Sequence, residues 1–272
     1  MKIALCQMNS SDDPAENLRN LSLMLEQAAK GGATFVLTPE VTNCVSTSRA
    51  HQAQVLQVEA ADETLAALRD KAADLGIWLL IGSLALKTND PDGRFANRSF
   101  LIAPDGMIAA RYDKIHMFDV QLGDGESYRE SAGYRPGDAA ITALLGGSSI
   151  GLTICYDLRF PHLFRALAQN GADIITVPAA FARPTGRAHW ETLLRARAIE
   201  NGVFILAPAQ TGDHGGSRKT HGHSMVIAPW GEVLVDAGTK PGVYFCEIDL
   251  SDVQKTRARV PSLGHDRKFD GP

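Results

Sequence analysis

Apolar positions along the chain follow two periods, which together predict an alternation of strands and helices. Short runs of consecutive apolar residues predict strands, whereas apolar residues spaced three or four apart predict one face of a helix. Strands are predicted at 2–8, 34–37, 77–86, 98–104, 107–114, 149–154, 173–177, 203–207, 223–228, 232–236 and 242–249. Helices are predicted between 14 and 31, at 62–75, at 161–171, at 187–200 and shortly after 249.

This order of elements predicts an α/β fold in a single domain that spans residues 1–272. Strands alternate with helices as in parallel sheets, but hairpins interrupt the alternation, one of them at Asp105-Gly106. The sheet should therefore be mixed, and two sheets between helix layers are one possible arrangement. Segments 115–147 and 211–222 are rich in glycine and polar residues and are expected to form loops.

Composition narrows the class of protein. The 272 residues are 44% hydrophobic, and 27 basic residues against 31 acidic ones leave a net charge of -4 without a charged block. This balance disfavours a nucleic-acid-binding surface and excludes a disordered chain. Four scattered cysteines contain no CxxC pair, which argues against a disulfide framework or a zinc ribbon. No apolar stretch approaches the length of a membrane span or signal peptide, so we expect a cytoplasmic enzyme.

Three reactive side chains share one position relative to the predicted strands. Glu40, Lys114 and Cys155 each follow an apolar, strand-like run. Ligands of α/β folds gather at the carboxyl ends of strands, so the three could meet. A carboxylate can take the proton of a thiol nucleophile, and an ammonium group can stabilise an oxyanion. Taken singly, each residue could equally be structural: a core cysteine, a solvated carboxylate and a surface lysine.

The residues around these positions resemble the nitrilase superfamily of carbon–nitrogen hydrolases. Residues 38–40 (TPE), 112–116 (YDKIH) and 154–161 (ICYDLRFP) resemble its three motifs, in the family's order. Residues 188–201, 222–226 and 229–231 resemble a helix and a late hairpin of its Nit-type amidases. The resemblance extends from Lys2 to about Asp266. It implies an αββα sandwich with two mixed sheets between helix layers, which assembles into a homodimer or a larger homo-oligomer.

The same resemblance implies a catalytic role for each matching residue. Glu40 would be the general base and Cys155 the nucleophile, while Lys114 and the backbone N–H of Tyr156 would stabilise the oxyanion. A second glutamate of the family matches Glu130 best, and Glu126 in the same glycine-rich segment is the alternative. The family's chemistry needs no cofactor and no metal.

Fewer residues indicate how the site would bind its substrate. Arg159 is either a structural ion-pair partner or a carboxylate clamp, since guanidinium binds carboxylate through two hydrogen bonds. The resemblance to Nit-type amidases implies that this carboxylate belongs to an α-keto acid. By resemblance, Phe181 and Thr185 would form pocket walls. His221 and His223 could lie on one strand face, but no third ligand completes a recognised metal-site spacing.

The sequence thus predicts a cysteine-dependent amidase that acts on the amide of a small α-keto acid compound. Residues 209–212, His214 and residues 221–226 resemble the amidases that act on deaminated glutathione more than they resemble omega-amidases, which act on 2-oxoglutaramate or 2-oxosuccinamate. Other possibilities are a nitrilase, a Cys–His hydrolase, or a thiol-binding module without activity. A Cys–His hydrolase would need a histidine base, and an inactive module would be expected to have lost Glu40 or Lys114.

Overall fold

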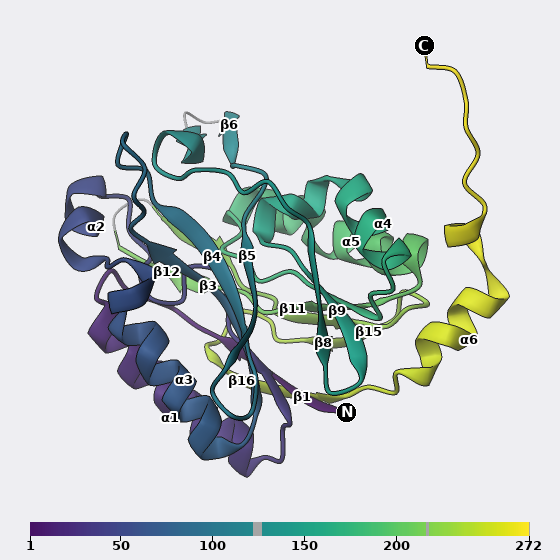
Figure 1. Cartoon of the computed structure of the whole chain (residues 1–272), viewed down its shortest axis with the longest axis horizontal. Helices are drawn as coiled ribbons and strands as arrows, with labels where there is room; N and C mark the ends of the chain where they lie inside the picture. Colours follow the sequence, from purple (N-terminus) through teal and green to yellow (C-terminus); the bar gives the residue numbers. More distant parts are fainter. Residues whose placement is uncertain (122–126, 216–217, 272) are drawn as a thin grey trace.

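The structure is a computed structural model that describes residues 1–121, 127–215 and 218–271. Its main body consists of two six-stranded mixed sheets that face each other between layers of helices (Figure 1). This arrangement confirms the predicted αββα sandwich. Two short two-stranded sheets lie outside the main sheets.

The first sheet has the strand order β16-β1-β2-β3-β4-β5. Its strands are β1 (Lys2–Gln7), β2 (Phe35–Leu37), β3 (Trp78–Leu86), β4 (Ala96–Ile102), β5 (Ile108–Asp113) and β16 (Gly242–Glu247). β1, β2 and β3 pair in parallel, while β4, β5 and β16 join antiparallel. Helices α1 (Pro14–Lys30) and α3 (Glu63–Leu75) cover its outer face (Figure 1).

The second sheet has the order β15-β14-β11-β10-β9-β8. Its strands are β8 (Ile141–Leu145), β9 (Ser148–Leu152), β10 (Ile174–Thr176), β11 (Phe204–Ala207), β14 (Met225–Ile227) and β15 (Val233–Asp236). The three central strands β9, β10 and β11 are parallel. Helices α4 (Pro161–Gln169) and α5 (Arg183–Asn201) pack on this sheet, and α6 (Ser251–Arg259) precedes the extended C-terminal tail (Figure 1).

Alternating side chains of the first strands build two separate layers of the core. Ile3 and Leu5 of β1 face the second sheet, whereas Ala4 and Cys6 face α1 and α3. All four side chains are fully buried, as expected for a strand covered on both faces. The apolar runs that predicted these strands therefore fill both layers.

Local signals at the helix ends explain why the predicted boundaries hold. Asp13 caps α1 by accepting hydrogen bonds from two backbone N–H groups of its first turn, and Pro14 follows as the first helical residue. Asp62 caps α3 by accepting from one backbone N–H, that of Leu65, and the helix ends at Gly76, whose φ of 62° is left-handed.

The structure corrects the prediction at four places. The predicted loop 115–147 contains β6 (Asp119–Gln121), β7 (Ser127–Arg129) and β8, and the loop 211–222 contains β12 (Thr211–Asp213) and β13 (Lys219–His221). Helix α2 (Arg49–Val55) was not predicted because only one of its residues is buried, which leaves no apolar period. Finally, α5 begins four residues early, at Arg183, because Pro184 is accepted in its first turn.

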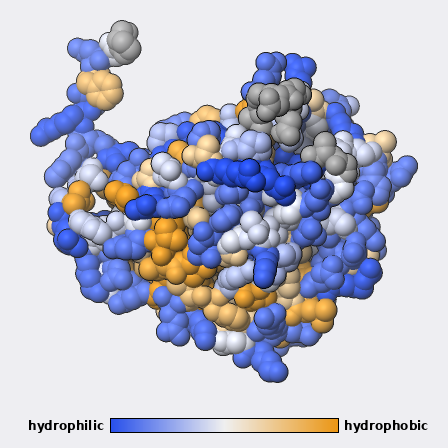
Figure 2. All heavy atoms as spheres, turned by 180° about the vertical axis from the view of Figure 1, so that it is seen from behind, coloured by the Kyte–Doolittle hydropathy of each residue, from blue (hydrophilic) through white to orange (hydrophobic). Residues whose placement is uncertain are grey.

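Apolar side chains also appear on the surface. Figure 2, which views the molecule from behind, shows a patch of them on that face. None of the described helices is long and apolar enough to cross a membrane.

Candidate active site

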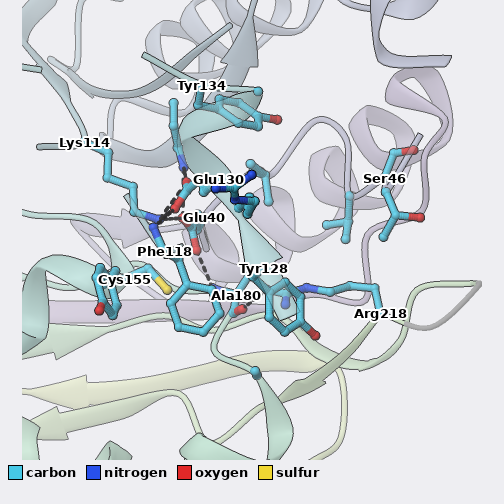
Figure 3. Close-up of a pocket in the computed structure, with 18 of the residues that line it drawn as sticks. Glu40, Ser46, Lys114, Phe118, Tyr128, Glu130, Tyr134, Cys155, Ala180 and Arg218 are labelled. Carbon is cyan, nitrogen blue, oxygen red and sulfur yellow. Dashed lines mark hydrogen bonds and ion pairs between the residues drawn. The ribbon is translucent and has the colours of Figure 1, made fainter. Parts of the chain in front are cut away.

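The three predicted reactive residues come from both sheets and meet where strands end. Glu40 lies three residues after β2, and Lys114 follows β5 directly. Cys155 begins the short 3-10 helix η3 (Cys155–Arg159) after β9. The structure therefore brings together the three side chains that the strand-end pattern singled out (Figure 3).

Lys114 lies between two carboxylates. Its Nζ is 2.8 Å from Oε1 of Glu40 and 2.9 Å from both carboxylate oxygens of Glu130. Only 2% of the Lys114 surface is exposed. Burial alone would lower the pKa of the lysine, but Glu130 and Glu40 raise this pKa well above its usual value. Lys114 is therefore a permanently charged ammonium group inside the protein.

Glu40 is held as a carboxylate by several donors. Besides Lys114, Nδ2 of Asn97 donates to its Oε1 over 2.9 Å, and the backbone N–H of Ala180 donates to its Oε2 over 2.8 Å. Burial acts to raise the pKa of Glu40, but Lys114, the thiol of Cys155 and the N–H of Ala180 together lower it. A buried, ionised carboxylate that lines the same cavity as the thiol of Cys155 is a suitable proton acceptor.

Glu130 holds the lysine from the opposite side. It begins the 3-10 helix η2 (Glu130–Ala132), and its Oε2 accepts a hydrogen bond of 2.6 Å from the backbone N–H of Phe118. It thus ties the segment after Lys114 to the lysine side chain. Glu126, the alternative second glutamate, lies outside the described residues.

Cys155 occupies a backbone conformation that side chains rarely adopt. Its φ is +49°, and its N–H donates to the carbonyl of Pro178 over 2.9 Å. A non-glycine residue with positive φ costs free energy and often marks a functional position. Burial and the neighbouring Glu40 raise the pKa of its thiol well above the usual value, against the effect of Lys114. The sulfur is therefore protonated at rest and needs a base before it can attack.

One buried carboxylate connects the lysine segment to the cysteine turn. Asp157 has no exposed surface, and each of its oxygens accepts two hydrogen bonds. Oδ1 accepts from the backbone N–H and the ring Nδ1 of His116, at 3.1 and 2.7 Å. Oδ2 accepts from the hydroxyl of Tyr112 and the N–H of Ile154, at 2.7 and 2.8 Å. Because Tyr112 and His116 flank Lys114, Asp157 fixes the lysine relative to Cys155.

A cavity of about 640 Å³ opens over these groups, which is a usual size for a small-molecule site. Tyr156, Phe181 and Thr185 line it. Tyr128 and Arg218 line it as well (Figure 3). The cavity thus contains an ionised base, a protonated thiol and an ammonium group within reach of a bound molecule.

Arg159 does not line this cavity but lies just behind its wall. Its guanidinium carbon is 5.8 Å from the ring centroid of Tyr156 and 5.5 Å from that of Phe181. Its Nη2 is 3.3 Å from Nδ1 of His189. Arg159 is partly exposed and forms no ion pair within residues 1–121, 127–215 and 218–271. A carboxylate clamp would require it to reach past the two rings.

The structure adds residues that sequence reasoning missed. Asn97 in β4, the N–H groups of Phe118 and Ala180, and the side chain of Asp157 all contact the site through long-range pairings. Asp157 had a signal, since it lies within the cysteine motif. For Asn97, the only signal in the sequence was that it is a polar residue inside an apolar strand.

The histidine-rich segment forms no recognisable metal centre. The rings of His221 and His223 stack with centroids 4.4 Å apart, and Asp236 accepts from His223. In the part of the chain that the structure describes, no group of three or more His, Cys, Asp or Glu side chains could hold a metal ion.

The chain is similar to known proteins over almost its whole length. The family model described as Carbon-nitrogen hydrolase matches residues 2–258. A deaminated glutathione amidase of Synechocystis sp. is 40% identical over 264 residues, which cover 96% of both chains. The crystal structure of the C. elegans NitFhit protein superposes with a TM-score of 0.91 at 36% identity, covering 98% of this chain and 65% of NitFhit.

A second solved structure shows the active-site cysteine of a similar protein after a covalent reaction. A mutant of the amidase from Nesterenkonia sp. AN1 shows Michael addition of acrylamide at the active-site cysteine. It is 29% identical to this chain with a TM-score of 0.78, and the match covers 96% of this chain and 98% of that one.

Proposed function

The chain belongs to the carbon–nitrogen hydrolase family, and from this premise we propose that it hydrolyses the amide of a small α-keto acid compound, with deaminated glutathione as the preferred substrate. The observation that carries the proposal is that Glu40, ion-paired to Lys114, lines the wall of one cavity together with Cys155. Relatives that are 35–40% identical and carry this substrate in their names support the choice.

The first half of the reaction forms a thioester. Glu40 takes the proton from Cys155, and the sulfur attacks the amide carbon. The carbonyl oxygen becomes an oxyanion that Lys114 and the N–H of Tyr156 stabilise. Lysine has three N–H donors, and the two oxygens of Glu130 can share one of them. Glu40 takes the second, so the third remains for the oxyanion. Tyr156 lies in the first turn of η3, where backbone N–H groups have no partner within the helix.

The second half releases the acid. When the tetrahedral centre collapses, the carbon–nitrogen bond breaks, and the amine leaves with the proton that Glu40 had accepted. A water molecule then gives a proton to Glu40 and attacks the thioester carbon. The carbon–sulfur bond breaks, and the proton returns to the sulfur of Cys155. Glu130 keeps Lys114 in place throughout, because both of its oxygens lie 2.9 Å from Nζ.

For the acyl half of the substrate we propose Arg159 as the partner of the keto-acid carboxylate. It lies against Tyr156 and Phe181, two walls of the cavity, and forms no ion pair among the described residues that would hold it elsewhere. Phe181 and Thr185 would enclose the acyl chain. Omega-amidase activity on 2-oxoglutaramate remains the alternative, since that substrate presents the same acyl group and releases ammonia.

The test is a comparison of kcat/KM for deaminated glutathione, 2-oxoglutaramate and an aliphatic nitrile with purified protein. We expect the highest value for deaminated glutathione and no turnover by Cys155→Ala, with the acyl group found by mass spectrometry on Cys155 of the wild type. A higher value for 2-oxoglutaramate would establish the omega-amidase instead. Turnover by Cys155→Ala, or of the nitrile alone, would overturn the proposal.

We also infer that residues 1–272 form one domain and that two copies associate. Exposed apolar side chains of α5 and the β14–β15 hairpin support association: Ile199, Trp230, Val233 and Leu234 are 38–52% exposed. Light scattering of the purified protein should give at least twice the mass of 29.2 kDa. A monomer at micromolar concentration would contradict this inference.

A further inference from the structure

We propose that Arg218 binds a carboxylate on the amine half of the substrate, so that the site selects amides whose leaving group is a carboxylated amine such as a dipeptide. This inference rests on the proposed function. There, Arg159 binds the acyl half of the substrate, and Arg218 would bind the amine half. The inference is drawn from the charge and the shape of the cavity.

The outer part of the cavity is positively charged. Its lining includes three arginines, Arg49, Arg129 and Arg218, and among the described lining residues the only carboxylates are Glu40 and Glu130. Lys114 already engages both of these carboxylates. Within the described part of the cavity wall the arginines therefore have no compensating acid, and a ligand that carries a carboxylate would supply it.

Arg218 is the arginine best held for binding. Its guanidinium carbon is 5.1 Å from the ring centroid of Tyr128, and its Nη2 donates to the carbonyl of Ala180. One nitrogen of the guanidinium group is thus held by the protein. Because the group is planar, its remaining N–H donors point in a defined direction. Arg49 and Arg129 are exposed side chains at the rim. No ion pair involves Arg218 within the described residues.

The position of Arg218 matches the size of a leaving group. Ala180 accepts from Arg218 through its carbonyl and donates to Glu40 through its N–H, so one residue and a hydrogen bond at each end separate the guanidinium from the base. An extended dipeptide amine places its carboxylate about 7 Å from the scissile nitrogen. Figure 3 shows Arg218 and Ser46 across the cavity from Cys155 and Lys114. The amine half of a substrate would therefore extend from the thiol toward Arg218.

The two arginines would then recognise opposite ends of one molecule. Arg159 lies behind Tyr156, whereas Arg218 lies over Tyr128. A primary amide releases ammonia and has nothing to place against Arg218. The contact would distinguish a dipeptide amide from a primary amide with the same acyl group.

The experiment uses matched substrates that differ only in this charge. Deaminated glutathione, its C-terminal carboxamide and 2-oxoglutaramate are compared by kcat/KM with the wild type, Arg218→Met and Arg218→Lys. Lys219→Met is the control, because Lys219 is exposed, adjacent in sequence and absent from the cavity lining. Thermal unfolding of each variant verifies that it is folded.

We expect the wild type to prefer the free acid to its carboxamide by roughly 10- to 100-fold, the value of a charge-assisted pair of hydrogen bonds. Arg218→Met should remove this preference, Arg218→Lys should retain part of it, and Lys219→Met should keep it in full. Equal losses on the acid and the carboxamide, or a preference that survives in Arg218→Met, would overturn the inference and leave the proposed function standing. Failure of the wild type to cleave any of the three substrates would instead overturn the proposed function and this inference with it.

Discussion

Replacing Asp157 by asparagine should weaken the fold and the chemistry together. Each oxygen of Asp157 accepts two hydrogen bonds, and one donor on each side is a backbone N–H, that of His116 or of Ile154. An asparagine side chain presents an NH₂ group on one of the two sides. The hydroxyl of Tyr112 and the ring of His116 can reverse their roles as donor and acceptor, but a backbone N–H cannot. Either orientation of the amide therefore leaves one buried N–H unpaired.

The expected loss of stability follows from the one buried N–H group that is left unpaired. An unpaired buried N–H costs about 1–3 kcal/mol, and the loss of charge assistance at the other bonds adds ~1 kcal/mol. The free energy of unfolding should fall by about 2–4 kcal/mol. For a chain of 272 residues this lowers Tm by roughly 4–8 °C, because the unfolding entropy scales with length. If Lys114 shifts by about 1 Å from Cys155, the rate should fall by about 10²-fold.

Calorimetry and steady-state kinetics on deaminated glutathione measure both effects. Asp173→Asn is the matched control: Asp173 also accepts a backbone N–H, from Ser149 over 3.2 Å, but its side chain is 30% exposed. Water can replace that contact, so the control should lose less than about 1 kcal/mol. A wild-type Tm and rate in Asp157→Asn would refute the argument that this carboxylate joins the two segments.

Four further predictions address residues of the site. Because Lys114 and the N–H of Ala180 lower the pKa of Glu40, the acid limb of the kcat/KM profile should lie below the usual carboxyl range, with activity lost as pH falls through the lowered pKa. Glu40→Gln should lose about 10²–10⁴-fold at neutral pH, and its residual rate should rise with pH as the thiol of Cys155 ionises without a base; a flat profile would argue against Glu40 as the base. Lys114→Arg should lose about 10²-fold or more, since a planar fork does not fit between the two carboxylates; wild-type turnover would contradict the oxyanion role. Arg159→Met should raise KM for α-keto acid amides by at least about 10-fold and much less for an uncharged amide of similar size; equal increases would identify a structural arginine.

Sequence reasoning predicted the parts of the molecule that local signals determine. Strand β1, which contains Ile3 and Leu5, is buried on both faces and forms an apolar run in the sequence. The caps at Asp13 and Gly76 mark helix ends. The strand ends that carry Glu40, Lys114 and Cys155 lie together in the structure. Their assignment to catalytic roles came from the resemblance and stays a prediction.

What the sequence could not provide depends on contacts between distant residues. Asn97 contacts Glu40 across 57 positions, and Ala180 contacts it across 140. Strand β8 reads as loop because its side chains are mostly half-buried, and it is fixed by pairing with β9. Arg218 lies in a segment with no apolar period, so only the folded cavity identifies it.

The protonated state of the thiols has a consequence for the lifetime of the protein. All four cysteines lie within the described ranges, and the pKa of each thiol is raised: burial raises that of Cys6 and Cys44 to about 12, and that of Cys155 well above its usual value. Peroxides and alkylating agents attack thiolates, and a thiol that keeps its proton reacts with them slowly. Cys155 should therefore react with peroxides more slowly than a resting thiolate would, and it should become more reactive while Glu40 holds its proton.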